Sequence, residues 1–166
     1  NEVTPETRTS SAWAIRTMYY LPYRASVRGE YRHYSDTWGI EGWNVELGYV
    51  QPLANGLTID VSYRYYTQGT SDFYSDLYPR QNSQNFLSRD KELSGFSSNT
   101  IGLGLTYQFR TSLLPFFKRG EVSLFADYME FTYDDFRDVL KGGSAGDEPL
   151  YTMDATTLRA FVSFWY

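Results

Sequence analysis

Cysteine is absent from all 166 residues, so the chain offers no disulfide framework and no thiolate metal ligand. It has one histidine, His33, and we expect neither a metal nor a haem site unless a second chain supplies the ligands. Uninterrupted apolar runs are short, as at residues 113–117, whereas a transmembrane helix needs roughly 20 apolar residues. A chain of this kind can cross a bilayer only with strands.

Positive charge is scattered along the chain and nowhere clustered. The net charge is -5 at pH 7, and no basic patch of the kind that binds phosphate backbones is present. We therefore expect no nucleic-acid partner. The first eleven residues are polar and lack the apolar core of a signal peptide, so we expect a mature protein or part of one.

Aromatic residues, in contrast, are abundant. The chain has 16 Tyr, 11 Phe and 4 Trp, and together they make up 19% of its residues. Rings with one polar end suit a surface that is apolar on one side and wet on the other, such as a membrane interface or a large binding surface.

Seven segments alternate apolar and polar residues with period two, over the length that a tilted strand needs to cross the hydrocarbon layer. They are residues 10–21, 24–35, 41–51, 56–68, 98–110, 120–133 and 155–166. In one of them, Ile59 and Val61 oppose Asp60 and Ser62. The sequence predicts a single all-β domain over residues 1–166, an antiparallel transmembrane β-barrel.

The connections between these segments alternate in length. The turns that contain Pro22, Pro52 and Pro115 are comparatively short; SDTWGIEG and two long loops, residues 69–98 and 134–154, lie on the other side. Because outer-membrane barrels have short periplasmic turns and long extracellular loops, this order predicts an integral protein of the bacterial outer membrane. Its first partners are then outer-membrane lipid and lipopolysaccharide.

With this orientation, aromatic residues of the apolar faces fall at both predicted interfaces, and aliphatic residues such as Val61 and Leu105 lie between them. The outer girdle would contain Trp13, Tyr31, Trp43, Tyr63, Tyr65 and Tyr128. The periplasmic girdle would contain Tyr19, Tyr49, Tyr107, Phe109, Phe164 and Tyr166. An aliphatic belt between two aromatic rims is what a lipid-facing wall requires.

The last nine residues, LRAFVSFWY, alternate and end on an aromatic side chain. This ending resembles the C-terminal signal that the barrel-assembly machinery recognises, which makes that machinery an expected partner. With Tyr166 in the periplasm, counting back seven strands places Asn1 outside the cell, yet bacterial single-chain barrels have an even number of strands. We expect the C-terminal part of a larger barrel; a short strand hidden near the start, or a wall completed by another chain, are the alternatives.

Two stretches resemble the motifs of a family of bacterial outer-membrane proteins defined only as domain of unknown function 3570. Residues 31–49, YRHYSDTWGIEGWNVELGY, resemble its Y-R-x-Y-x-D-x-W-G-I motif, and residues 62–76, SYRYYTQGTSDFYSD, resemble its R-Y-Y-T-Q-x-x-x-D-F-Y motif. The resemblance implies the C-terminal portion of a barrel of several hundred residues, and it implies no activity.

The faces predicted to point inward carry charges of both signs. They are Arg16, Arg28, Glu30, Arg32, Glu46, Asp60, Arg64, Arg110, Glu121, Asp127 and Arg159. One interpretation is a wet lumen in which ion pairs between strands satisfy the charges. The other is an arginine ladder opposite an acidic ladder, which would orient a solute or select ions.

Enzymatic activity is not expected, because the alternation turns His33 outward, away from any inward serine. Acidic loop segments, such as residues 88–92, could bind Ca²⁺, but none has the spacing of a calcium loop, and we interpret them as solvated. In the longer loop, Phe73 and Tyr74 are expected to pack, with Asp72 and Asp76 as polar anchors. No cofactor is expected.

Two functions therefore remain open. The first is a pore-forming or structural barrel that works through its charged lumen and anchors its surface loops. The second is a barrel that serves as wall, sheath or anchor for a protein partner in an outer-membrane assembly, for secretion or for electron transfer.

Overall fold

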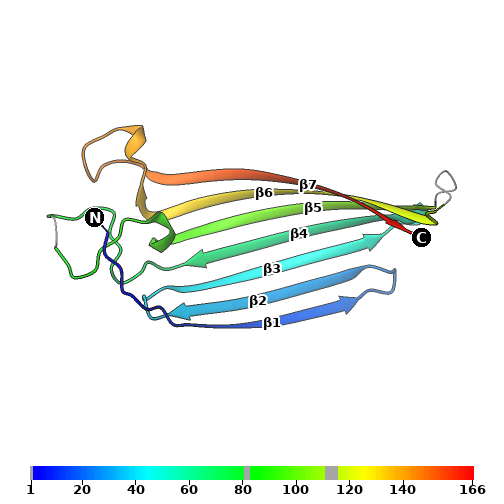
Figure 1. Cartoon of the computed structure of the whole chain (residues 1–166), viewed down its shortest axis with the longest axis horizontal. Helices are drawn as coiled ribbons and strands as arrows, with labels where there is room; N and C mark the ends of the chain where they lie inside the picture. Colours follow the sequence, from blue (N-terminus) through cyan, green and yellow to red (C-terminus); the bar gives the residue numbers. More distant parts are fainter. Residues whose placement is uncertain (1, 81–82, 111–115) are drawn as a thin grey trace.

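Seven strands form one antiparallel sheet in sequence order (Figure 1). The structure is a computed structural model and describes residues 2–80, 83–110 and 116–166. The strands are β1 (Ser10–Tyr20), β2 (Ser26–Asp36), β3 (Glu41–Pro52), β4 (Leu57–Gln68), β5 (Phe96–Arg110), β6 (Arg119–Arg137) and β7 (Leu150–Trp165). Each strand pairs with the next, and β1 and β7 form the two edges. The expected all-β antiparallel sheet is confirmed.

In the described parts of the connections there are three short 3₁₀ helices: η1 (Ala54–Gly56), η2 (Lys91–Leu93) and η3 (Val139–Lys141). Among the described residues, no helix is both long enough and apolar enough to span a membrane. The positions expected for Asn1 and for the turn at Pro115 fall outside the residues that the structure describes.

The register keeps like side chains on the same face across the sheet. Residues directly opposite each other on paired strands point to the same side, so Ile59, Leu105, Leu124 and Ala160 form one apolar row from β4 to β7. The neighbouring rows, on the other side of the sheet, hold polar side chains such as Thr58, Asp60 and Arg159 together with the rings of Phe125 and Phe161. One face of the whole sheet is therefore mainly apolar and the other mainly polar, as the alternation within each strand predicts.

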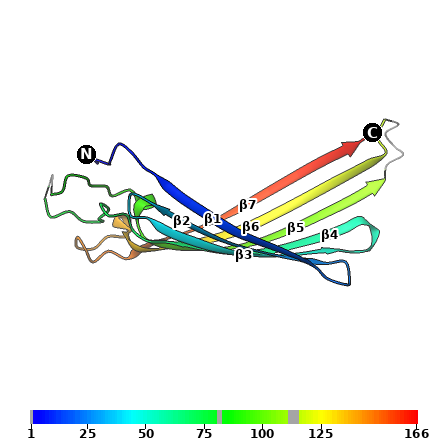
Figure 2. The same cartoon turned by 90° about the horizontal axis from the view of Figure 1, so that it is seen from below.

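The sheet is twisted and curved (Figure 2). The connections after β2, β4 and β6 gather at one end, which we call the loop end, together with the N-terminal segment; the connections after β1 and β3 and the end of β7 lie at the other, the turn end (Figure 1). One connection on the loop side is shorter than the sequence suggests, because β2 and β3 leave only residues 37–40 between them.

Strand bounds differ most from the predicted ones in β6 and β7. The hairpin continues beyond residues 133 and 155, so the second loop shrinks from residues 134–154 to 138–149. Tyr133, Phe136 and Tyr151 contact one another across this extension, with ring centroids 5.5 to 5.8 Å apart. A register shift between Thr132 and Arg137 breaks the period-two pattern, which is why the alternation does not reveal the extension.

Smaller differences occur at two other strand starts. Strand β2 begins at Ser26 and not at residue 24, because Arg24 has a φ of 68° and lies in the turn. Strand β5 begins at Phe96, which shortens the first long loop to residues 69–95. Near the start of the chain, the described structure contains only an isolated bridge between Val3 and Leu87, not an eighth strand.

The buried apolar core lies at the loop end and not within the sheet. Ile40, Phe73 and Leu93 form it, and Trp38 packs against it with its ring 5.3 Å from the Phe73 ring. We call this group, together with loop 69–95 and turn 37–40, the loop cap. The cap joins segments that are far apart in the sequence.

Asp36 closes the turn at the base of the cap. Its buried carboxylate accepts hydrogen bonds from Nε and Nη2 of Arg8 (2.8 and 2.6 Å), from the Tyr34 hydroxyl (2.9 Å) and from the backbone N–H groups of Trp38 (2.9 Å) and Ile40 (3.1 Å). Burial alone would raise the pKa of Asp36, but these donors outweigh it and hold the pKa below its ordinary value.

Replacing Asp36 by Asn should loosen the cap. The neutral amide is a weaker acceptor than the carboxylate, and its NH₂ group would face the N–H and O–H groups that donate to Asp36. We expect a loss of about 1–3 kcal/mol in local stability, measured as faster hydrogen exchange of residues 36–40. Glu41→Gln, which changes an exposed carboxylate at the start of β3, is the matched control and should leave exchange unchanged. Equal exchange in the wild type and Asp36→Asn would contradict this role.

The wild-type cap should also weaken in acid. Because the folded pKa of Asp36 is lowered, its contribution is complete above the ordinary carboxyl pKa of about 4 and is lost as the pH falls through the folded value. Hydrogen exchange at residues 36–40 should therefore accelerate below about pH 4 in the wild type, beyond the intrinsic dependence of exchange on pH, and much less in Asp36→Asn.

Candidate functional site

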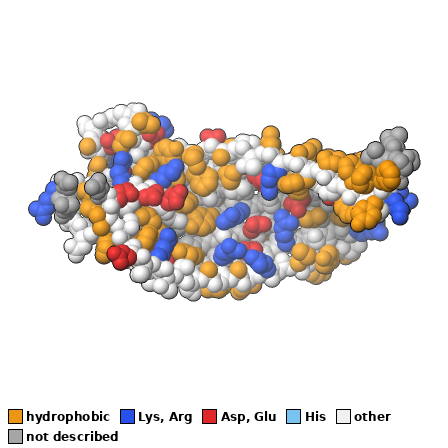
Figure 3. All heavy atoms as spheres, viewed as in Figure 1, with side chains coloured by type: hydrophobic (Ala, Val, Ile, Leu, Met, Phe, Trp, Pro, Cys, Tyr) orange, Lys and Arg blue, Asp and Glu red, His pale blue; other side chains and the backbone are white. Residues whose placement is uncertain are grey.

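The charged residues singled out in the sequence all lie on one face of the sheet, which we call the charged face. The register places Arg16, Glu30, Glu46 and Arg64 in one row across β1 to β4, and Asp60 and Arg159 in another. The remaining members, Arg28, Arg32, Arg110, Glu121 and Asp127, lie in neighbouring rows of the same face. Figure 3 shows charged side chains of both signs across the middle of the sheet.

Ion pairs between strands join most of these side chains. Arg28 Nη1 lies 3.1 Å from the Asp60 carboxylate, and Arg159 Nη2 lies 2.6 Å from the Asp127 carboxylate. Glu30 pairs with Arg16 across the strands and lies 3.3 Å from Arg32 on its own strand. Such pairing agrees with the first of the two interpretations, in which ion pairs between strands satisfy the charges of a wet lumen.

The other charged side chains have different neighbours. Glu46 lies 3.9 Å from Arg28, a second and longer contact for that guanidinium. Glu121 accepts a hydrogen bond of 2.8 Å from the Gln108 amide, and the Arg64 guanidinium lies over the Tyr66 ring, 5.9 Å from its centroid. Arg110 faces Arg119 across the β5–β6 pair.

Three glycines let these side chains lie flat against the sheet. A Cβ at Gly48 would overlap the Arg28 side chain, which crosses this position to reach Asp60 two strands away. A Cβ at Gly102 would lie 2.5 Å from Ser62 Oγ, and one at Gly104 would lie 2.7 Å from the Phe125 ring. The result is a hollow of about 290 Å³ with a glycine floor, lined by Arg28, Asp60, Ser62, Phe125, Asp127 and Arg159.

The opposite face is mainly apolar, with Glu130 and Asp154 side by side on β6 and β7, and its aromatic residues gather towards the two ends. At the loop end, Tyr31 lies between Trp13 and Trp43, with ring centroids 5.3 and 6.3 Å away, and Tyr65 continues this row 5.4 Å from Trp43. His33 stacks on Trp13 in the same row, at 5.8 Å. Tyr63 and Tyr128 lie one step further in, on either side of Ile101.

Towards the turn end, the Tyr107 and Phe109 rings stack 5.9 Å apart, and Phe164 packs against Phe117 at 5.2 Å. Tyr19 and Tyr49 flank Val27 in one row, and Tyr166 follows the end of β7. Aliphatic side chains lie between the two aromatic groups and are exposed in the described structure, Leu124 by 52% and Leu158 by 77%. An uncovered apolar surface this large marks an interaction surface.

The long loop folds back onto the sheet and is tied at several points. Asp135 accepts hydrogen bonds from Thr70 Oγ1 and from the Gly95 backbone N–H (3.0 Å). The Asp76 carboxylate pairs with Arg89 and Arg137 at 3.0 and 3.2 Å. Asp76 thus anchors the loop as the sequence suggests.

The expected packing residues of this loop have different roles. Phe73 is buried in the cap core. Tyr74 is half-buried, and its burial raises the pKa of its hydroxyl above the ordinary value. The Asp72 carboxylate has no hydrogen bond to a described residue. It occupies the space that a Cβ at residue 39 would take, and Gly39 has a φ of 83°.

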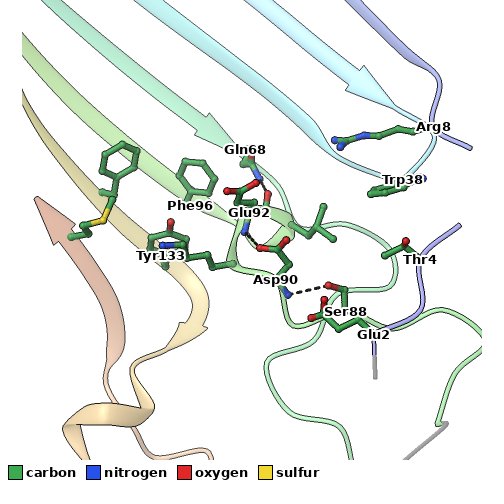
Figure 4. A pocket seen from close by; sticks show the side chains of 14 residues that line it. Glu2, Thr4, Arg8, Trp38, Gln68, Ser88, Asp90, Glu92, Phe96 and Tyr133 are labelled. Carbon is green, nitrogen blue, oxygen red and sulfur yellow. Dashed lines mark hydrogen bonds between the residues drawn. The ribbon is translucent and has the colours of Figure 1, made fainter. Parts of the chain in front are cut away.

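A second hollow, of about 680 Å³, lies beneath the loop cap on the charged face (Figure 4). Its walls include Arg8, Trp38, Gln68, Glu92, Phe96 and Tyr133. Sequence reasoning did not assign these residues to a site, because they come from segments that only the folded cap brings together. Within the described residues, no group of three or more His, Asp or Glu side chains is placed to hold a metal ion.

Over residues 2–147, the sequence matches the family described as Protein of unknown function (DUF3570). The chain belongs to this family. No curated protein and no solved structure matches the chain. The family assigned from the two motifs is therefore confirmed, while its description names no activity.

The two motifs of this DUF3570 chain meet in the loop cap. Asp36 and Ile40 of the first motif close the turn and fill the core, and Phe73 of the second packs against both Trp38 and Ile40. The Asp72 backbone N–H donates to the Trp38 carbonyl oxygen at 2.9 Å. The signature residues that define the resemblance thus hold the cap on the sheet.

Replacing Gly48 by Ala should push Arg28 off the sheet and separate it from Asp60. We expect a loss of about 1 kcal/mol in the free energy of unfolding, measured by chemical denaturation of the purified protein. Gly69→Ala, at a position where a Cβ would make only an ordinary contact of 3.7 Å with the Glu41 carbonyl oxygen, should cost less. If the cause is the clash with Arg28, Gly48→Ala should be nearly neutral when added to Arg28→Ala; an equal loss in both backgrounds would contradict it.

Proposed function

We propose that this sheet is part of the wall of an outer-membrane β-barrel, with its apolar face in lipid and its charged face lining a water-filled lumen. The observation that carries the proposal is the belt of exposed aliphatic side chains between two groups of aromatic side chains. Rings at the two interfaces and aliphatic side chains at the centre match the layers of a bilayer.

Strand length and the alternation of faces support the same proposal. All seven strands have at least 11 residues, and a tilted strand needs about 9 to 11 to cross the hydrocarbon layer. The charges of the other face would meet water in the lumen. In a soluble sheet the exposed aliphatic belt would instead favour aggregation.

Closure of such a barrel requires strands beyond these seven. In lipid, the unpaired backbone groups along the edges of β1 and β7 would cost several kcal/mol each. We therefore take the sheet as the C-terminal portion of a larger barrel, in which further strands bridge the two edges. The alternating ending of β7 is then the contact for the barrel-assembly machinery.

The charged face favours a pore-forming or structural barrel. Most of its charges are paired and lie against the wall, which leaves the lumen polar but open. The loop end offers a specific observation for the alternative, a wall or sheath for a partner protein. At the tip of the β6–β7 hairpin, Leu140 is 92% exposed beside the exposed Val139, on the side that would face a partner outside the cell.

Cysteine labelling at two adjacent positions of the central strand β4 tests the membrane orientation. Val61 is on the apolar face and Ser62 lines the hollow on the charged face, so Val61→Cys should resist a water-soluble maleimide in intact outer membranes. Ser62→Cys should react, and both variants should react after denaturation. Reaction of Val61→Cys in the membrane at the rate seen for Ser62→Cys would argue against a lipid-facing wall.

Conductance across planar bilayers tests the pore. The purified protein should open channels, and Asp127→Asn, which leaves Arg159 without its carboxylate, should shift the reversal potential towards anion selectivity. Glu130→Gln changes an acidic side chain of the same strand on the opposite face and is the control. If no channels are observed and a partner protein co-purifies stably, the sheath function would be favoured over the pore.

A further inference from the structure

The hollow beneath the loop cap has an aromatic wall. The Phe96 ring contacts Tyr66, Phe131 and Tyr133, with centroids 5.5, 6.2 and 5.2 Å away. These side chains come from three neighbouring strands, β4, β5 and β6, and lie on the charged face. They form a patch of rings at the loop end, on the side that a lumen would occupy.

The facing wall is polar and comes from the start of η2. Asp90 uses its carboxylate to cap this helix through the Glu92 backbone N–H (3.0 Å). Lys91 places its ammonium group over the Tyr151 ring, 5.6 Å from the centroid. The exposed Glu92 carboxylate has no hydrogen bond or ion pair with any residue that the structure describes. A donor and a free acceptor thus stand side by side opposite the rings.

Tyr133 links the two walls. Only 4% of the residue is exposed, and it lines the hollow, yet its hydroxyl has no hydrogen-bond partner in the described part of the chain. Figure 4 shows the Tyr133 and Phe96 side chains together on one side of the hollow, near Glu92. A hydroxyl that opens onto a hollow can complete its hydrogen bonds with a ligand.

The charges of the walls decide which ligand fits. Glu2, Asp90 and Glu92 disfavour an anion, while Lys91 disfavours a cation. The charge of Arg8 is already neutralised by Asp36. A wholly apolar ligand would leave Glu92 and the Tyr133 hydroxyl without partners. A neutral ring with hydroxyl groups satisfies all of these groups, because its C–H face packs on aromatic rings and its hydroxyls both donate and accept.

We propose that the hollow beneath the loop cap binds a neutral carbohydrate. Phe96 and Phe131 would stack against the sugar ring, and Glu92, Lys91 and the Tyr133 hydroxyl would bind its hydroxyl groups. The volume of about 680 Å³ lies within the range of ligand pockets and exceeds what a single small ion needs. The site lies within the loop cap and the loop end of the sheet, so binding does not depend on whether the barrel conducts.

Titration of the purified full-length protein in detergent with three probes tests this site. The probes are maltose, which is neutral, glucuronate, which is anionic, and glucosamine, which is cationic at pH 7. Binding is followed by calorimetry and by tryptophan fluorescence, to which Trp38 in the wall of the hollow contributes together with the three other Trp residues. We expect saturable binding of maltose and none of the charged sugars at the same concentrations.

Two variants and a matched control assign the binding to these residues. Glu92→Gln and Phe131→Leu should each weaken maltose binding about tenfold, through a lost charged acceptor and a lost stacking ring. Glu130→Gln, the same change on the opposite face of β6, should bind as the wild type. Circular dichroism confirms that each variant is folded before titration.

Three outcomes would overturn the inference: no saturable maltose binding to the folded protein, preference for a charged sugar, or equal maltose affinity in Glu92→Gln and the wild type. The labelling of Val61→Cys and Ser62→Cys is read independently of these titrations. If sugar binding fails and the labelling is as expected, only the carbohydrate proposal is refuted. If the labelling fails and sugar binding is intact, only the proposal of a lipid-facing wall is refuted.

Discussion

The continuous antiparallel register from β1 to β7 is the constraint on which the rest of the structure depends. Side chains alternate along each strand, and directly opposed residues share a face, so the register turns a period-two sequence into two faces of different chemistry. A slip of one residue between β4 and β5, for example, would place Asp60 opposite Leu103. The ion pairs, the aromatic rows and the glycine-floored hollow all require that no slip occurs.

At the loop end a different interaction takes over. Within the described residues, no second layer packs against the sheet, and the buried apolar core consists of a few side chains contributed by turn 37–40, loop 69–95 and η2. Asp36 makes this core possible because one buried carboxylate satisfies Arg8 and two backbone donors of the turn together. With the turn fixed, Trp38 and Ile40 are positioned to receive Phe73 from the long loop.

Much of the sheet could be predicted from the sequence, and little of the cap. Alternation of the kind seen at Ile59–Ser62 is a local signal, and it reveals strands and their faces without knowledge of tertiary contacts. The β6–β7 extension gave no such signal, because the register shift after Thr132 interrupts the period and aromatic contacts of Tyr133 stabilise it instead. Glu92 and Tyr133 line the same hollow although about 40 residues separate them, and no spacing in the sequence predicts that they lie close together. The motifs around Asp36 and Phe73 identified the family before the structure showed that they pack together.

The state of the charges indicates where the proposed barrel would discriminate between solutes. Along the wall, Arg28 with Asp60 and Arg159 with Asp127 are paired, and Gly48 lets Arg28 lie flat against the sheet. Paired opposite charges have fields that fall off quickly and are screened by salt within about 10 Å, so such a wall keeps a lumen wet but gives weak selectivity. Two polar groups without a described partner, the Glu92 carboxylate and the Tyr133 hydroxyl, lie beneath the cap. The proposed recognition site therefore lies at the loop end, where the signature residues hold the cap over the sheet.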